Sequence, residues 1–75
     1  MAIYKDLNND SGIQAYDIEE NHIDVHFRRG GSYRYTSESV GRYNLDKMIS
    51  LAKSGDGLNS FINIIVKKDY SEKLS

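Results

Sequence analysis

Residues 22–28, His-Ile-Asp-Val-His-Phe-Arg, alternate strictly between polar and apolar side chains. Successive side chains of a β-strand point to opposite faces of a sheet, so this pattern predicts a strand with one buried and one wet face. Ile23, Val25 and Phe27 would point into the core. The chain is therefore expected to contain a sheet that is covered on one side.

The stretch before this strand predicts a second strand with an irregularity. Within residues 12–18, Ile13 and Ala15 would lie on one face, whereas Tyr16 and Ile18 would lie on the other. A β-bulge inserts one extra residue into a strand and reverses this parity. We therefore expect a bulge near Ala15.

A hairpin joins the strand of residues 22–28 to a further strand, Ser-Tyr-Arg-Tyr-Thr, and this hairpin has two alternative registers. If the turn is residues 30–31 alone, Tyr33 and Tyr35 face solvent, where aromatic rings can stack on unpaired bases. If the loop is residues 29–31, Phe27 pairs with Tyr33, and both tyrosines join the core. The second register separates apolar from polar residues, whereas the first buries an arginine without an evident partner, so the pattern favours the second.

The second half of the chain changes to the period of a helix. Asn44 can cap the start of a first helix, and Gly55 can end it in the left-handed conformation. Either Asp56 or Asn59 can cap a second helix, and the pattern does not choose between them. Each helix has an apolar stripe at i, i+3, i+4 and i+7. The stripes consist of Leu45, Met48, Ile49 and Ala52 in the first helix and of Leu58, Phe61, Ile62 and Ile65 in the second.

These elements predict an α+β fold, a three-stranded antiparallel β-meander packed on two C-terminal α-helices. Residues 1–10 would be a polar lead-in, residues 11–70 the domain, and residues 71–75 a tail that frays. A chain of 75 residues forms one domain with a small core, so self-association would add stability and a homo-oligomer stays open.

An ordered series of residues runs along nearly the whole chain. It consists of Ser11, Ile13, Tyr16, Asp17, Val25, Phe27, Gly30, Tyr33, Arg34 and Tyr35, followed by Met48, Leu51, Ala52, Gly55, Gly57, Leu58, Asn59, Phe61, Ile62 and Tyr70. This series resembles the KTSC domain, which also occurs at the C-terminus of some lysyl-tRNA synthetases. The chain departs from the family at Gly41, where many members have proline. The resemblance implies a small bacterial or phage protein with a suggested RNA-binding role and no catalytic residues.

The arginines gather in one part of the sequence. The net charge of −1 argues against a protein whose main role is to bind a polyanion. All four arginines nevertheless lie between residues 28 and 42, where Glu38 is the one acid, and arginine binds phosphates with two parallel hydrogen bonds. The alternative is ordinary solubility charge. The residues predicted to bind nucleic acid are Arg28, Arg29, Arg34 and Arg42, with His26 beside them.

Catalytic and metal chemistry have little support in the sequence. The chain has no cysteine, and no serine has an evident histidine base, so we expect neither an enzyme nor a cofactor. His22, Asp24 and His26 alternate on one strand face, but the two histidines would be about 13 Å apart, too far to share one ion. Asn59 is expected to cap a helix, and a role in ligand binding is the less favoured alternative.

Two hypotheses about function remain. The first is a non-catalytic accessory module that binds RNA or another phosphate-bearing ligand, such as a small nucleotide. The second is a compact protein-binding module, for instance a phage or mobile-element product that inhibits a host enzyme. Phosphate binding weakens steeply with salt, whereas an apolar interface does not. The sequence has no bilayer-spanning apolar run, signal-peptide pattern or cysteine, which favours a cytoplasmic protein without a membrane partner.

Overall fold

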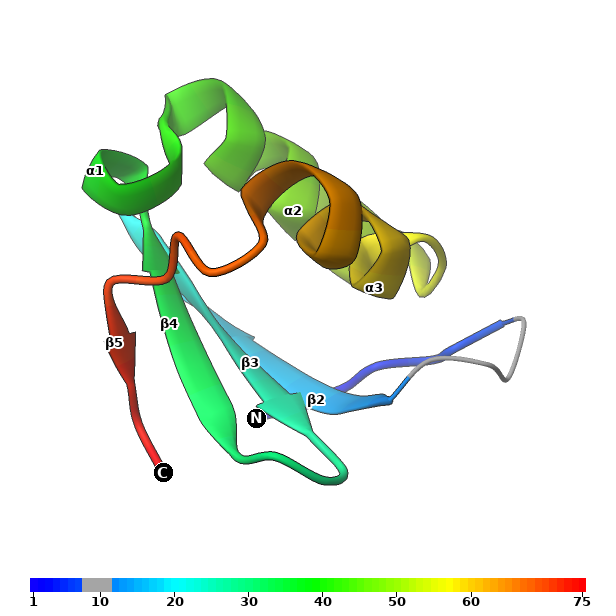
Figure 1. The fold of residues 1–75 in the computed structure, drawn as a ribbon. Helices are drawn as coiled ribbons and strands as arrows, with labels where there is room; N and C mark the ends of the chain where they lie inside the picture. Colours follow the sequence, from blue (N-terminus) through cyan, green and yellow to red (C-terminus); the bar gives the residue numbers. More distant parts are fainter. Residues whose placement is uncertain (8–11) are drawn as a thin grey trace.

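The computed structural model describes residues 1–7 and 12–75. In this part of the chain, an antiparallel sheet in the order β1-β2-β3-β4-β5 carries all of the helices on one face (Figure 1). The strands are β1 (Ala2–Ile3), β2 (Ile13–Ile18), β3 (His22–Phe27), β4 (Ser32–Thr36) and β5 (Glu72–Lys73). The helices are α1 (Ser37–Val40), α2 (Arg42–Ser54), α3 (Leu58–Phe61) and the π-helix η1 (Ile62–Val66).

The α+β class and the antiparallel sheet are confirmed, but a meander of just three strands is wrong. The predicted strands form the centre of the sheet, and the two ends of the chain add a short strand at each edge. On one side Ala2 pairs with Tyr16, and on the other Lys73 pairs with Tyr33. A three-stranded sheet would leave backbone N–H and C=O groups unpaired at both edges, and these short strands pair part of them. Residues 2–3 of the predicted lead-in and residues 72–73 of the predicted tail are therefore strands of the sheet, and residues 8–10 lie outside the described residues.

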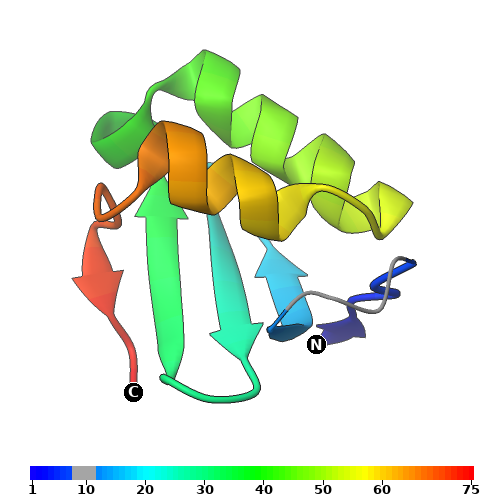
Figure 2. The ribbon, with the colours of Figure 1, turned by 45° about the vertical axis from the view of Figure 1, so that its right-hand side comes forward.

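Helices α2 and α3–η1 lie side by side over the sheet and leave its other face open (Figure 2). The predicted bulge is present, because Ile13 pairs with Phe27 while Ala15 pairs with His26. The shift lets Ile13 and Tyr16 both contribute to the apolar side of the sheet. None of the helices in the described ranges is long and apolar enough to cross a bilayer.

The β3–β4 hairpin has a register that neither sequence alternative contained. Tyr33 pairs with Val25, and Tyr35 pairs with Ile23. The Phe27 N–H donates to the carbonyl oxygen of Gly31 at 3.0 Å, so the loop is residues 28–30. The predicted face is nevertheless right, because the difference is two positions and side chains alternate with a period of two. Tyr35 is a core residue with 2% exposure, and Tyr33 is half-buried.

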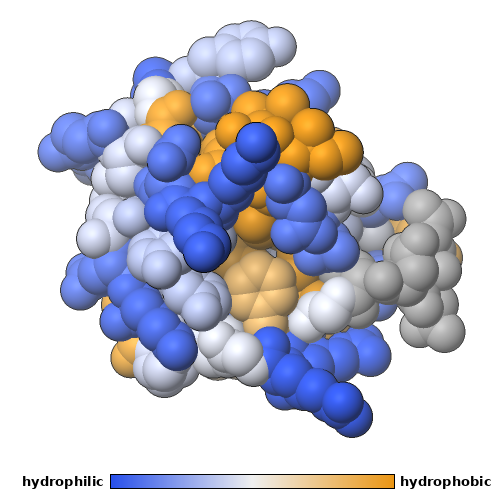
Figure 3. All heavy atoms as spheres, viewed as in Figure 1, coloured by the Kyte–Doolittle hydropathy of each residue, from blue (hydrophilic) through white to orange (hydrophobic). Residues whose placement is uncertain are grey.

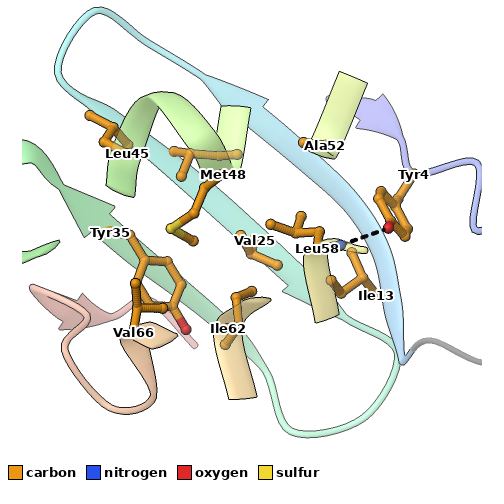
Figure 4. Packing of buried hydrophobic residues seen from close by; sticks show 11 residues of the cluster. Tyr4, Ile13, Val25, Tyr35, Leu45, Met48, Ala52, Leu58, Ile62 and Val66 are labelled. Carbon is orange, nitrogen blue, oxygen red and sulfur yellow. Dashed lines mark hydrogen bonds between the residues drawn. The ribbon is translucent and has the colours of Figure 1, made fainter. Parts of the chain in front are cut away.

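The core lies between the sheet and the helices (Figure 4). The N-terminal segment reaches into it, because Tyr4 is buried and its hydroxyl oxygen accepts a hydrogen bond from the Leu58 N–H at 3.2 Å. The buried members are Tyr4, Ile13, Ile23, Val25, Tyr35, Leu45, Met48, Ala52, Leu58, Ile62 and Val66. This set includes residues from β2, β3, β4, α2, α3 and η1, so one core ties these six elements together.

The predicted start of the first helix is corrected by an extra helical turn. Thr36 and Ser39 form a reciprocal capping box that begins α1 directly after β4. Gly41, with φ of 89°, then separates α1 from α2, so Asn44 lies inside α2 instead of capping it. The side-chain amide of Asn44 donates to the carbonyl oxygen of Val40 at 2.9 Å. The left-handed end at Gly55 is confirmed, with φ of 79°.

The second predicted helix is divided into α3 and η1. Gly57, with φ of 83°, directly precedes α3, and Asn59 lies inside that helix and does not precede it. Within η1 the hydrogen bonds run from residue i to residue i+5, as in the bond from the Lys67 N–H to the Ile62 carbonyl oxygen at 2.6 Å. The wider turn brings Val66 into the core and leaves Ile65 half-exposed.

Candidate functional site

The arginines predicted to bind nucleic acid do not form one surface. Arg28 and Arg29 are exposed on the hairpin loop, Arg34 is in the middle of β4, and Arg42 begins α2. Arg42 pairs with Asp46 at 3.0 Å and also donates to a backbone carbonyl oxygen in the β2–β3 turn at 3.1 Å. Its guanidinium therefore already has acceptors within the chain.

Arg34 is held on the open face of the sheet by two acids. Its Nε and one terminal nitrogen donate to the two carboxylate oxygens of Asp24 at 2.8 and 3.0 Å. Its other terminal nitrogen lies 3.5 Å from Glu72 on the edge strand β5. The hydrogen bonds to Asp24 raise the pKa of Arg34 further above its ordinary value. A phosphate would need the same two parallel N–H donors that Arg34 gives to Asp24.

The hairpin loop is where arginine remains most accessible. Arg28 has a side chain that is 56% exposed, and one of its terminal nitrogens is 3.9 Å from the carboxylate of Asp6. Arg29 is exposed at the tip. A ligand that binds arginine side chains would contact Arg28 and Arg29 at this loop. Arg34 is farther along β4 and is already paired with Asp24.

His26 lies between two partners on the open sheet face and not beside free arginines. Its Nδ1 is 2.7 Å from the hydroxyl oxygen of Ser32, and its Nε2 is 2.7 Å from a carboxylate oxygen of Asp17. The three side chains come from β4, β3 and β2. The hydrogen bond from His26 lowers the pKa of Asp17, with a second contribution from the N-terminal ammonium group of Met1 at 3.1 Å.

No pattern in the sequence connects these three residues, and a serine beside a histidine base was not expected. The missing information was the hairpin register, because His26 faces Ser32 in the observed pairing. In both registers considered from the sequence, His26 lies opposite a residue other than Ser32. A correct register combined with the bulge at Ala15 would have placed all three polar side chains on one face.

The other polar residues of this face do not gather into a metal site. His22 Nε2 is 3.9 Å from Asp24, whose carboxylate is already bound by Arg34. Over residues 1–7 and 12–75, the structure contains no group of three or more histidine, cysteine, aspartate or glutamate side chains placed to hold an ion. Ion pairs and hydrogen bonds occupy the polar side chains instead.

A second candidate site is apolar and lies on η1. Ile64 and Ile65 are adjacent and are 67% and 50% exposed, and Phe61 on the preceding turn is half-buried. Apolar side chains gather over this part of the molecule, with charged side chains around them (Figure 3). Directly after η1, Lys67 adopts φ of 49°, which is uncommon for a residue with a side chain. We name Phe61, Ile64 and Ile65 the η1 surface.

No family model, curated protein or solved structure matches this chain. The resemblance to the KTSC domain stays a prediction. Several residues that carry it are buried in the core, including Ile13, Val25, Leu58 and Ile62. Gly30 has φ of 98°, which favours glycine for conformational reasons. These residues contribute to the core or to the backbone conformation, so the resemblance does not by itself identify a binding residue.

Proposed function

We propose that this protein is a small binding module of the KTSC type that recognises another protein through the η1 surface. The observation that carries the proposal is the adjacent exposure of Ile64 and Ile65 on a helix whose other side is in the core. Burial of apolar side chains lowers the free energy of the protein, and Ile64 and Ile65 do not gain this stabilisation while they face water. Binding of a partner over them would provide it.

The local backbone supports a functional role for this segment. The π-helical turn places Val66 inside and Ile65 outside, and π-helical turns are frequent at functional sites. The uncommon backbone of Lys67 immediately follows, and strained residues also cluster at such sites. A regular α-helix over the same residues would follow the predicted stripe and would bury Ile65.

RNA binding, the hypothesis that the arginine cluster suggested, receives less support. Arg34 and Arg42 form ion pairs with Asp24 and Asp46. The net charge of the chain, −1, also disfavours binding of a polyanion. Arg28 and Arg29 on the hairpin loop would be left to contact phosphates. Two arginines provide a small electrostatic contribution compared with the several phosphate contacts of typical nucleic-acid-binding proteins.

The test is affinity capture from a bacterial lysate, with washes at low and at high salt. Wild type is compared with Ile64→Ser/Ile65→Ser and with the control Ile3→Ser/Leu7→Ser, which removes two apolar side chains of 70% and 65% exposure from another region. We expect a protein that stays bound at high salt to wild type and control but not to the η1 variant. With that partner purified, burial of two half-exposed isoleucines, worth about 2 kcal/mol, predicts about 30-fold weaker binding by the variant.

A parallel measurement distinguishes the RNA hypothesis. The fluorescence anisotropy of labelled single-stranded RNA is titrated with wild type and with Arg28→Ala/Arg29→Ala at low and moderate salt. Salt-sensitive RNA binding that is lost in the arginine variant and kept in the η1 variant would overturn the proposal. So would equal capture of every protein by wild type and by Ile64→Ser/Ile65→Ser.

A further inference from the structure

Three neighbouring strands bring a serine, a histidine and an aspartate together on the open face of the sheet. His26 and Ser32 are directly opposite each other in the β3–β4 pairing, and Asp17 reaches His26 from β2. Both hydrogen bonds of the histidine ring are 2.7 Å long. The side chain of His26 is 18% exposed, so the ring is held in place while its serine partner remains half-exposed.

The geometry defines which nitrogen can act as a base. The hydrogen bond from His26 lowers the pKa of Asp17, so Asp17 is a carboxylate at neutral pH and accepts the proton on Nε2. The neutral ring then presents the lone pair of Nδ1 to the hydroxyl group of Ser32. A nucleophile bonded to a base that is oriented by a third group is the arrangement of serine-dependent acyl transfer.

We propose that Ser32 is a nucleophile, that His26 is its general base, and that Asp17 is the residue that positions His26, together forming a site that reacts with esters. This inference concerns the opposite face from the η1 surface and is independent of the proposed function. It differs from the sequence expectation of a chain without catalytic chemistry.

The reaction consumes an ester and water, and the three side chains are regenerated at its end. The Ser32 oxygen attacks the ester carbonyl carbon while its proton passes to His26 Nδ1. The bond from that carbon to the leaving alkoxide breaks, and the imidazolium returns the proton to the alkoxide. Water then attacks the acylated serine by the same route, which releases a carboxylic acid and restores Ser32.

The surroundings of Ser32 favour an apolar acyl group. One row across the sheet connects Ile3 to Ala15, Ala15 to His26, and His26 to Ser32. The row continues beyond Ser32, whose carbonyl oxygen accepts a hydrogen bond from the Leu74 N–H at 2.7 Å. Ile3 and Leu74 are exposed at the two ends of this row. The polar pair is thus flanked by apolar side chains on the same surface.

The first experiment treats the full chain with an alkyl fluorophosphonate, which loses fluoride when a reactive serine attacks its phosphorus. Intact mass and peptide mapping then locate the label. We expect labelling at Ser32, none at that position in Ser32→Ala, and a rate at least about 100-fold lower in His26→Gln, the lower end of general-base catalysis. Label spread evenly over the serines, or an unchanged rate in His26→Gln, would overturn the proposal.

A second experiment uses the absence of cysteine from the chain. Ser32→Cys creates a single thiol beside His26, and Ser50→Cys creates a matched thiol on the exposed side of α2. If His26 acts as a base, the thiol at position 32 reacts faster with iodoacetamide, and His26→Gln abolishes the difference. Equal rates for both thiols would contradict the proposal even if His26→Gln folds poorly, and circular dichroism verifies the folding of each variant.

The role of Asp17 is tested by the rate of fluorophosphonate labelling in two variants of this residue. The charged groups around His26 are Asp17, with the ammonium group of Met1 beside it, and the Asp24–Arg34 pair in the neighbouring row. Asp17→Asn removes the carboxylate that holds the His26 ring, so this variant is expected to be labelled more slowly than wild type, and Asp17→Glu is expected to recover part of the rate. An unchanged labelling rate in Asp17→Asn, or an equal loss of rate in Asp17→Asn and Asp17→Glu, would remove Asp17 from the site.

Discussion

Replacing Tyr4 by phenylalanine tests whether the N-terminal segment belongs to the folded core. The phenol ring is buried, with 3% exposure, and its oxygen accepts a hydrogen bond from the Leu58 N–H at the start of α3. This N–H belongs to the first turn of a helix and therefore has no carbonyl partner within that helix. Tyr4→Phe keeps the ring and removes the acceptor, so a buried donor loses its partner.

The expected cost follows from the hydrogen bond and from the size of the chain. The N···O distance of 3.2 Å is at the long end of the normal range. A neutral hydrogen bond of this kind contributes about 1 kcal/mol, and the buried N–H left without it can add to that cost. With an unfolding entropy of about 2.1 cal/mol/K per residue, 75 residues give about 0.16 kcal/mol/K, so 1 kcal/mol lowers the melting temperature by about 6 °C.

The assay is thermal and urea unfolding followed by circular dichroism. Tyr43→Phe is the matched control, because Tyr43 is 80% exposed and loses no buried contact, so its melting temperature should stay within about 2 °C of wild type. A Tyr4→Phe variant as stable as wild type would refute the reasoning. It would mean that residues 1–7 do not contribute the buried acceptor for α3.

Two further perturbations test a backbone position and a buried phenol. Gly55→Ala is expected to cost at least about 1–2 kcal/mol in urea unfolding, because φ is 79° and the new Cβ would be 2.6 Å from the Lys5 Cβ, whereas Gly12→Ala meets no atom within 4 Å and should be close to neutral. Burial, followed by the charges of Tyr33 and Tyr70, raises the pKa of Tyr35 to about 12. The unfolded phenol ionises near pH 10, so the stability contributed by neutral Tyr35 is complete below about pH 10 and is lost as the pH rises toward about 12. Urea unfolding across this range should show the loss in wild type and a smaller one in Tyr35→Phe.

The parts of the fold that the sequence predicted correctly depend on local periodicity. The alternation in residues 22–28 identified β3, and the apolar stripe identified α2, because burial on one face determines both patterns. The bulge near Ala15 followed from a conflict of parity within a single strand. These predictions required no knowledge of which distant residues meet.

The parts that the sequence did not predict depend on long-range pairing. Residues 2–3 and 72–73 are too short for a periodic signal, and they form strands because an existing sheet edge offers them partners. The hairpin register was wrong by two positions, which preserved the face of Tyr35 but changed every cross-strand pair. The contact between His26 and Ser32 was missed for this reason.

The arginine cluster shows why charge along a sequence is a poor guide to a phosphate-binding surface. Arg34 has no acid within three residues along the chain, yet in the fold Asp24 and Glu72 approach it from the two neighbouring strands. In the folded chain, these two carboxylates balance the positive charge of Arg34. The sequence does not show this, because cross-strand partners are far apart along the chain. The exposed isoleucines of η1 behave in the opposite way, since a regular helix would have buried one of them. A binding surface on this chain is therefore indicated by what the fold leaves without a partner, which favours the η1 surface over the arginines.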